Sequence, residues 1–301
     1  MTLSQLATFL AVARAGSVKG AAEALVVTQP SVSAAISALS GELGVDLTTR
    51  AGRTIRLTSA GEAFLPFAAD VLGLVDQGGR AAREAAGLSA SELRIAAVTT
   101  AGEFLLPALL QRFGARHPEI GLTLEVANRE RVFQRVLDHD SDIAITGRPP
   151  AQDDRLQSRS FLRNDLVLIT ARGDPLTRRR SVSVEELADR TWLLRETGSG
   201  TRTMVEEFLS KHDLSPTTLT LGSNGAIKQA VRVGLGVSLQ ARIAVELELE
   251  SGLLATLTLD GGLPIRNWYV LMSSVGHARA PVRAFYDFVA SEGADVVATA
   301  H

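Results

Sequence analysis

Helical periodicity in the first 58 residues constrains this chain most, because it falls into three short segments separated by turn signals. Apolar residues recur at helical spacing over residues 3–13. Ser17 is a good N-cap for a second segment that ends at Leu25, and Thr28 can cap a third, in which Pro30 is tolerated in the first turn. Two short helices joined by a tight turn predict a helix-turn-helix.

The third predicted helix has one apolar face and one polar face. We expect the apolar stripe to be buried; it comprises Val32, Ile36, Leu39 and Leu43. The opposite face carries small polar side chains that suit a DNA major groove, namely Gln29, Ser31, Ser33 and Ser37. Beyond this helix, arginines around a turn at Gly52 predict a two-stranded wing that meets phosphates or a minor groove. These arginines are Arg50, Arg53 and Arg56.

The charge of the chain restricts where nucleic acid can bind. The whole protein has a formal net charge of -2, so any DNA affinity must lie in one segment. Residues 1–58 carry five Lys and Arg against three Asp and Glu, which is a weak excess of positive charge. On the residues alone, a three-helix packing unit that binds no nucleic acid is therefore an alternative.

A dense set of motifs runs through residues 9–64: Gly16-Ser17, Ala21-Ala22, Gln29-Pro30-Ser31-Val32-Ser33, Leu43-Gly44 and Leu57-Thr58-Ser59-Ala60-Gly61. On these motifs the segment resembles the N-terminal domain of LysR-type transcriptional regulators. The resemblance implies that the third helix reads the major groove and that the wing contacts phosphates or the minor groove. The candidate DNA contacts are Lys19, Gln29, Pro30, Ser31, Ser33, Arg50, Arg53 and Arg56.

Two residues depart from the family pattern. Ser40 stands where the family usually has Glu, and Thr48 stands where it usually has Phe. Because the second change removes a buried aromatic side chain near the wing, the packing there must differ.

Residues 59–88 form one alanine-rich helical stretch. Small and apolar residues recur with alternating spacings of four and three, which is typical of a heptad seam in a two-helix coiled coil. The seam comprises Phe64, Ala68, Val71, Val75, Gly78, Ala82 and Ala85. This pattern favours a dimer; a long helix that lies on its own domain is the alternative.

From Glu92 onward, short β-like runs alternate with helical runs, which indicates an α/β architecture. Two similar lobes with a cleft between them resemble the periplasmic-binding-protein-like domain of LysR-type regulators. We therefore predict an α/β protein with an all-α N-terminal part. It comprises a winged helix-turn-helix domain at 1–58, a linker and dimerisation helix at 59–88, and an effector-binding domain at 89–301, with lobe I at about 92–161 and 266–301 and lobe II at about 162–265.

Three segments place hydroxyls and free backbone N–H groups at predicted helix starts: residues 98–102, 195–202 and 222–225. Helix starts attract anions, and ligands of open α/β sheets bind beyond the strand ends. We expect a carboxylated or phosphorylated ligand, with Arg202 pairing with it bidentately. A flexible loop with a helix cap is the alternative for Gly198 to Thr201. The candidate effector-binding residues are Thr99, Thr100, Gly147, Glu196, Thr197, Gly198, Ser199, Gly200, Thr201, Arg202 and Asn224.

Further motifs resemble one branch of the family. Asn128-Arg129-Glu130, residues 143–150 and residues 195–202 look like the regulators of Calvin-cycle carbon-fixation operons and their relatives, whose effectors include phosphorylated sugars and NADPH. The same motifs occur in relatives that control sulfur or nitrogen assimilation, which are the alternative for the target operon. The resemblance implies a regulator of double-stranded promoter DNA that responds to a small anionic metabolite. It also implies a tetramer made of two dimers, and RNA polymerase as a further partner. A family member that responds to an aromatic or amino-acid-derived carboxylate is the alternative.

The sequence offers no catalytic constellation, so an enzyme built on the two-lobed fold is the alternative outside the family, and we predict a protein that is not an enzyme. The histidines have no metal-ligand spacing, and neither a metal nor a cofactor is expected. The N-terminus lacks the pattern of a signal peptide, so we expect a cytoplasmic protein that contacts no membrane. Asp138, Asp140 and Asp142 surround His139, and there we expect a solvated loop before a strand and not a cation site.

Overall fold

The computed structural model describes residues 1–52, 54–88, 90–150 and 153–300, which divide into two compact units. Unit 1 consists of Met1–Ala90 together with Arg135–Ser141 and Ser273–Arg279. Unit 2 consists of Ser91–Gln134, Asp142–Met272 and Ala280–His301. Residues 135–141 and 273–279 therefore belong to unit 1, although the residues before and after each of these segments belong to unit 2.

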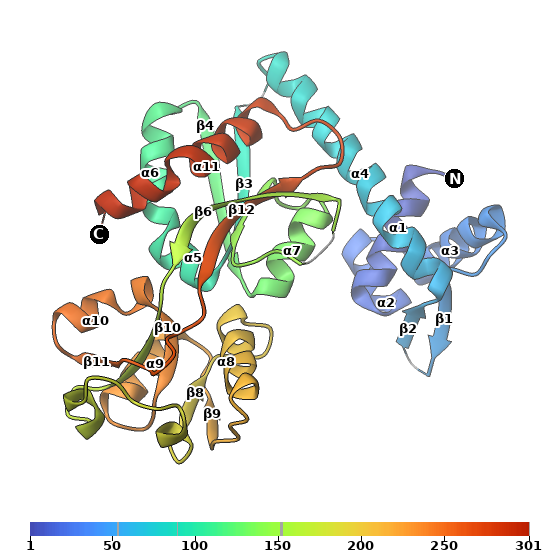
Figure 1. The fold of residues 1–301 in the computed structure, drawn as a ribbon. Helices are drawn as coiled ribbons and strands as arrows, with labels where there is room; N and C mark the ends of the chain where they lie inside the picture. Colours follow the sequence, from blue (N-terminus) through green and yellow to red (C-terminus); the bar gives the residue numbers. More distant parts are fainter. Residues whose placement is uncertain (53, 89, 151–152, 301) are drawn as a thin grey trace. The chain divides into compact units, whose positions relative to one another are not determined.

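Unit 1 begins with the predicted helix-turn-helix (Figure 1). The elements are α1 (Leu3–Ala15), α2 (Val18–Leu25), α3 (Gln29–Leu43), β1 (Thr48–Ala51), β2 (Thr54–Leu57) and α4 (Ser59–Ala85). The predicted caps are confirmed, because Ser17 accepts a hydrogen bond from the Gly20 amide and Thr28 accepts one from the Ser31 amide. The strands β1 and β2 pair antiparallel and form the wing.

The core of this helical part explains two details of its sequence. Val32 and Leu39 of α3 are fully buried as predicted, and Ile36 is partly buried, but the prediction for Leu43 is wrong because its side chain is exposed. Leu43 is the last residue of α3, beyond the point where the helix meets α1. Ser40 is buried, and its hydroxyl accepts a hydrogen bond from the Leu47 amide at 3.4 Å. A short polar side chain at this position thus ties the end of α3 to the start of the wing.

The predicted heptad seam of α4 divides into two parts. Phe64 and Ala68 pack inside the helix-turn-helix core, where the rings of Phe9 and Phe64 lie 5.5 Å apart. These two residues were therefore predicted wrongly as part of an outward seam, since the same helix face first closes the core of its own domain. Val71 and Val75, further along the helix, are exposed, and the pairing of this part with a second helix stays a prediction.

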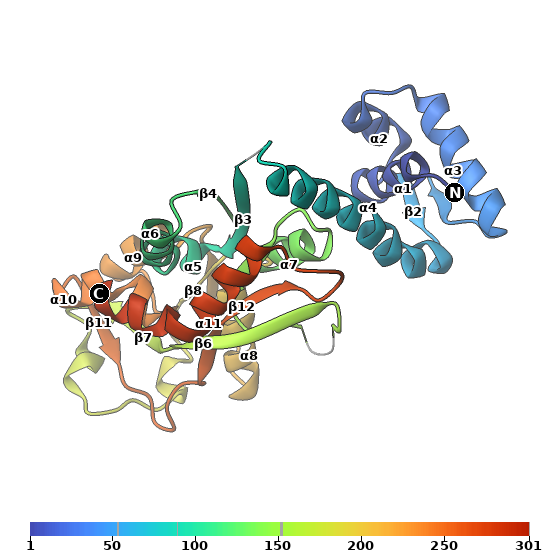
Figure 2. The ribbon, with the colours of Figure 1, turned by 90° about the horizontal axis from the view of Figure 1, so that it is seen from above.

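The first lobe of unit 2 is built on a five-stranded sheet with the order β4-β3-β5-β12-β6. Its strands are β3 (Ser91–Val98), β4 (Ile120–Ala127), β5 (Ile143–Thr146), β6 (Leu156–Asn164) and β12 (Arg266–Ser273). The helices are α5 (Thr99–Phe104), α6 (Leu106–Arg116), α7 (Arg129–Leu137) and α11 (Ala280–Ala300). β3 runs parallel to both β4 and β5, and β12 returns antiparallel to β5. Helix α11 lies against β6 and α6 (Figure 2).

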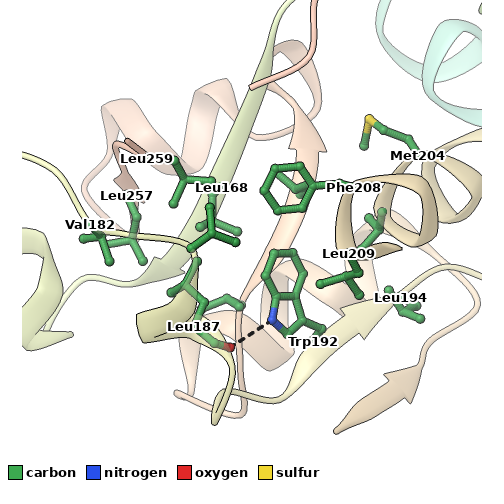
Figure 3. Packing of buried hydrophobic residues seen from close by; sticks show 14 residues of the cluster. Leu168, Val182, Leu187, Trp192, Leu194, Met204, Phe208, Leu209, Leu257 and Leu259 are labelled. Carbon is green, nitrogen blue, oxygen red and sulfur yellow. Dashed lines mark hydrogen bonds between the residues drawn. The ribbon is translucent and has the colours of Figure 1, made fainter. Parts of the chain in front are cut away.

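The second lobe has a three-stranded sheet with β7 (Leu166–Ala171) between β10 (Ser238–Ala241) and β11 (Leu254–Leu257). A parallel pair, β8 (Trp192–Leu194) and β9 (Thr218–Thr220), lies beside it. The helices are α8 (Gly200–Lys211), α9 (Asn224–Arg232) and α10 (Glu246–Glu250), with 3-10 turns at Pro175–Arg178, Glu185–Leu187 and Arg242–Ala244. Trp192 is fully buried at the centre, and its indole N–H donates to the Leu187 carbonyl (Figure 3).

The helices were also compared with the length and hydropathy that a membrane span requires. Among the described residues, no single helix is long and apolar enough to span a membrane. Helices α2 and α3, which are bent by 106° to each other, reach that length and hydropathy only as a pair.

Candidate functional site

The polar face of α3 is open to solvent in unit 1. The predicted contacts Gln29, Pro30, Ser31 and Ser33 are all exposed. The Ser31 hydroxyl lies 2.8 Å from that of Thr28, so it takes part in capping the helix as well as facing outward. Lys19 is also exposed and lies 3.8 Å from Glu23, one helical turn away. Gln29, Pro30, Ser31 and Ser33 lie at the start of α3, the second helix of the motif, where a recognition helix presents its base contacts, whereas Lys19 lies on the first helix, α2.

The wing adds positive charge beside this face. Arg50 on β1 and Arg56 on β2 are both exposed. Within the described part of the chain, neither arginine forms an ion pair, so both guanidinium groups are available to phosphate oxygens. Arg53 lies outside the described residues.

A cavity of about 520 Å³ lies between the two lobes of unit 2. Seven of the predicted effector-binding residues line it: Thr99, Thr100, Gly147, Glu196, Ser199, Gly200 and Thr201. Four do not line it: Thr197, Gly198, Arg202 and Asn224. The cavity therefore collects the start of α5, the end of β5 and the start of α8, which are far apart in the sequence.

A buried arginine that was absent from the predicted set organises one side of the cavity. Arg195 is 3% exposed and donates two hydrogen bonds to the Glu196 carboxylate, at 2.7 and 2.9 Å. It also donates to Asn224 Oδ1 at 2.6 Å and to Thr99 Oγ1 at 3.4 Å. Its donors are thus used within the protein, which makes Arg195 a group that orients others.

The partners of Arg195 are held in defined states. Burial alone would raise the pKa of Glu196, but the hydrogen bonds from Arg195 and from a backbone amide outweigh it, so this pKa lies below its usual value. Asn224 is 2% exposed, and its amide donates to Thr100 Oγ1 at 3.3 Å. Asn224 therefore stands behind the cavity wall and fixes a residue that lines it.

Arg202 was predicted as the anion partner, and its guanidinium is engaged elsewhere. It donates to Glu206 at 2.7 Å, to the Arg195 carbonyl at 3.2 Å and to Thr220 at 3.1 Å. These bonds hold the start of α8 against β8 and β9.

Arg129, at the start of α7, is the cation that sequence reasoning missed. It lines the cavity, lies over the Phe133 ring at 4.8 Å and donates to the Arg148 carbonyl at 2.9 Å. Burial and the nearby charge of Arg266 lower its pKa, and these two effects outweigh the opposing attraction of Glu207. Among the described residues no carboxylate lies within ion-pair distance of it. The motif Asn128-Arg129-Glu130 was the signal that could have identified it.

Helix α8 begins at the cavity with its first turn uncapped by side chains. Its N-cap residue, Ser199, makes no side-chain cap hydrogen bond, and Gly200 and Thr201 line the cavity. Gly198 has a φ of +85°, and a Cβ there would lie 2.9 Å from the Asn128 amide nitrogen, so glycine is required. The N–H groups of a helix start and its dipole together favour a bound anion.

The described residues contain no group of three or more His, Asp or Glu side chains that could hold a metal ion. The acidic residues near His139 were predicted to form a solvated loop, and this prediction is wrong. His139 and Asp142 are buried, Asp142 pairs with Arg94 and Asp138 pairs with Arg14, and of the cluster Asp140 has the most exposed side chain.

A winged helix-turn-helix followed by a long helix and a two-lobed domain with a polar cavity defines the class of DNA-binding regulators that carry an effector-binding domain. The bacterial regulatory helix-turn-helix family of lysR type matches residues 3–62, and the LysR substrate binding domain matches residues 86–294. The chain belongs to the LysR family of transcriptional regulators, which are not enzymes.

Similar proteins extend over nearly the whole chain. The transcriptional activator CmpR of Synechocystis is 36% identical over 289 residues, covering 96% of this chain and 94% of CmpR. A RuBisCO operon transcriptional regulator of Allochromatium vinosum is 36% identical over 295 residues, covering 98% and 97% of the two chains. The regulatory domain of CcmR from Synechocystis, solved in complex with 2-PG, is 33% identical with a TM-score of 0.63. It covers 67% of this chain and 96% of the CcmR domain.

Proposed function

We propose that this regulator binds promoter DNA through α3 and the wing, and that a small phosphorylated or carboxylated metabolite in the cavity between the lobes modulates this binding. The observation that carries the proposal is the half-buried cation of Arg129, which lines the cavity beside the open start of α8. A buried positive charge without a carboxylate partner is costly, and a bound anion relieves that cost.

The charges around the cavity support an anionic effector. Four arginines line it against two glutamates. Glu196 pairs with Arg195 and Glu207 pairs with Arg266 at 2.7 Å, which leaves Arg129 and Arg148 in excess. The similarity to a regulatory domain that binds 2-phosphoglycolate makes an organic phosphate the first class to test.

The DNA side of the proposal assigns the polar residues by position. Gln29, Ser31 and Ser33 face base edges from α3, with Pro30 beside them in the first turn. Lys19, Arg50 and Arg56 meet phosphates, and Arg53 belongs with them in the wing by sequence.

The assembly follows from the domain organisation. We take residues 1–58 as the DNA-binding domain, 59–88 as the linker helix and 89–301 as the effector domain, acting in the cytoplasm where promoter DNA lies. The exposed apolar residues of α4, including Phe67, Val71 and Val75, would pair with a second copy of the helix, and two dimers would form a tetramer. RNA polymerase is a further partner of the bound complex.

Calorimetric titration of the purified protein tests the cavity assignment. 2-Phosphoglycolate, inorganic phosphate and benzoate are added in turn at fixed pH and salt. We expect 2-phosphoglycolate to bind and to raise the melting temperature, because it offers two anionic groups to the arginines and to the start of α8. Binding of benzoate alone would replace an organic phosphate by an aromatic carboxylate. No heat and no melting shift with any of the three would contradict an anion-binding cavity.

A further inference from the structure

His139 is a buried residue in unit 1 that neither DNA nor the cavity uses. It follows the end of α7, its side chain is 2% exposed, and its φ is +59°. A residue with a Cβ rarely adopts this left-handed conformation, so the surrounding contacts must stabilise it.

Both nitrogens of the His139 ring are bonded to α4. Nε2 lies 2.9 Å from Asp70 Oδ1, and Nδ1 lies 2.8 Å from Gln77 Nε2. With its hydrogen on Nε2, the ring donates to Asp70 and accepts from Gln77. Between these two residues lies Gly73, where an added Cβ would be 2.2 Å from His139 Cγ. The absence of a side chain at Gly73 therefore leaves the space on α4 that the His139 ring occupies.

Neighbouring contacts in unit 1 reinforce the same junction. Asp138 pairs with Arg14 of α1 at 2.9 Å, which ties the segment to the helix-turn-helix as well as to α4. On the segment after β12, the buried Arg279 pairs with Glu84. Both segments that unit 1 receives from later in the chain are therefore fastened to helices of the DNA-binding half.

The opposite end of α7 belongs to the cavity. Asn128 Oδ1 accepts from the Arg131 amide and so caps the helix, and Arg129 in its first turn lines the cavity. The nine residues of α7 span about 14 Å at the usual helical rise. The chain thus passes through α7 from unit 2, where Arg129 lines the cavity, into unit 1, where His139 follows two residues after the helix ends.

We propose that α7 and His139 form a mechanical link through which occupancy of the cavity changes the grip of the Asp138–Asp140 segment on α1 and α4, and hence the affinity for DNA. This inference rests on the proposed function of the cavity. An anion that pulls on Arg129 reorients α7 as a unit, because a short helix moves as a rigid body. The ring of His139 then leaves the groove at Gly73, and its bonds to Asp70 and Gln77 break together.

The contact between Gly73 and His139 offers a test that needs no effector. In ligand-free protein, Gly73→Ala forces the His139 ring out of its place, whereas Gly79→Ala on the same helix meets only the Arg83 guanidinium at an ordinary 3.5 Å. The readout is affinity for the DNA upstream of the gene, at fixed salt. We expect Gly73→Ala to change this affinity by about fivefold or more, in the range of allosteric couplings, and Gly79→Ala to leave it unchanged.

A second variant separates the link from a general loss of helix packing. His139→Gly suits the left-handed backbone and removes the ring, so the chain folds without strain at this position. In the His139→Gly background, Gly73→Ala has no ring to displace, and we expect it to leave DNA affinity unchanged. An equal effect of Gly73→Ala in both backgrounds would overturn the proposal.

The effector arm uses 2-phosphoglycolate at saturation. We expect it to shift DNA affinity in the wild type and to bind His139→Gly with a similar heat while leaving its DNA affinity unchanged. A full DNA response in His139→Gly would also overturn the link. If 2-phosphoglycolate and inorganic phosphate bind neither protein, the proposed function of the cavity fails, and the Gly73 and His139 variants then decide only whether the contact of His139 with α4 controls the affinity for DNA.

Discussion

The helix-turn-helix and the cavity between the lobes present their functional side chains in opposite ways. On α3 and the wing, Gln29 and Arg56 are exposed, and their removal leaves no buried group without a partner. Around the cavity, Arg195 and Asn224 are almost fully buried and bonded to one another. The side chains of α3 and the wing have few partners within the protein, whereas those around the cavity are held in place by hydrogen bonds to one another. Substitutions in α3 and the wing should therefore change DNA affinity without changing the free energy of unfolding. Substitutions in the buried network around the cavity should lower both ligand affinity and the free energy of unfolding.

The largest effect should follow from Arg195→Ala. Removing this buried cation leaves the buried Asn224 and the partly exposed Glu196 without their donor; because solvent screens Glu196, we expect the loss to be that of hydrogen bonds to a charged group, about 1.5–3 kcal/mol. We expect the melting temperature of the effector domain to fall markedly and anion binding to disappear. Arg202→Ala on the same lobe is the control, since its loss removes more exposed contacts. Equal melting temperatures for the two variants would contradict the assigned role of Arg195.

Arg129→Ala should weaken anion binding in the cavity while it changes the stability of the protein only slightly. This arginine bonds only one carbonyl and lies over one ring, so its loss should reduce the free energy of unfolding by about 1 kcal/mol at most. Loss of a charge-assisted hydrogen bond to the ligand should weaken anion binding by about 1.5–3 kcal/mol, or roughly ten- to a hundredfold. Calorimetry with 2-phosphoglycolate measures this, and Arg131→Ala, an exposed arginine on the same helix, is the control. Unchanged affinity of Arg129→Ala for 2-phosphoglycolate would mean that the anion does not bind at Arg129.

The smallest effect is expected for Arg56→Ala in the wing. Because the side chain is exposed and unpaired with any described carboxylate, stability should be unchanged. Loss of one phosphate contact should lower the slope of log affinity against log salt by about 1 per DNA-bound chain. DNA titrations at several salt concentrations measure this slope. A change in sequence preference with the slope unaltered would place Arg56 on a base edge.

The same contrast explains how far the sequence could predict the molecule. Caps such as Ser17 and Thr28 act on amides three residues away, so their effect is local and the helices were predicted. Local patterns also located the helix starts at Thr99 and Ser199. The pairing of Arg195 with Asn224 joins residues 29 positions apart, and no periodicity encodes it.

Residues whose surroundings are set by tertiary packing were predicted less well. Phe64 fits a heptad seam by its spacing, but in the structure its ring packs against Phe9 in the core of its own domain. His139 and its acidic neighbours read as a solvated loop, because polar composition does not reveal that α4 provides partners for them. Arg129 was overlooked because the helix that carries it is polar, and its role depends on Arg148 and Phe133.

The decisive measurement is binding of the purified protein to the DNA upstream of its own gene, at fixed salt, without 2-phosphoglycolate and with it at a concentration that just saturates the wild type. We predict specific binding over random DNA of the same length, and an affinity that 2-phosphoglycolate at this concentration changes in the wild type and leaves nearly unchanged in Arg129→Ala. Specific binding that responds equally in both proteins would contradict a DNA switch controlled through the cavity.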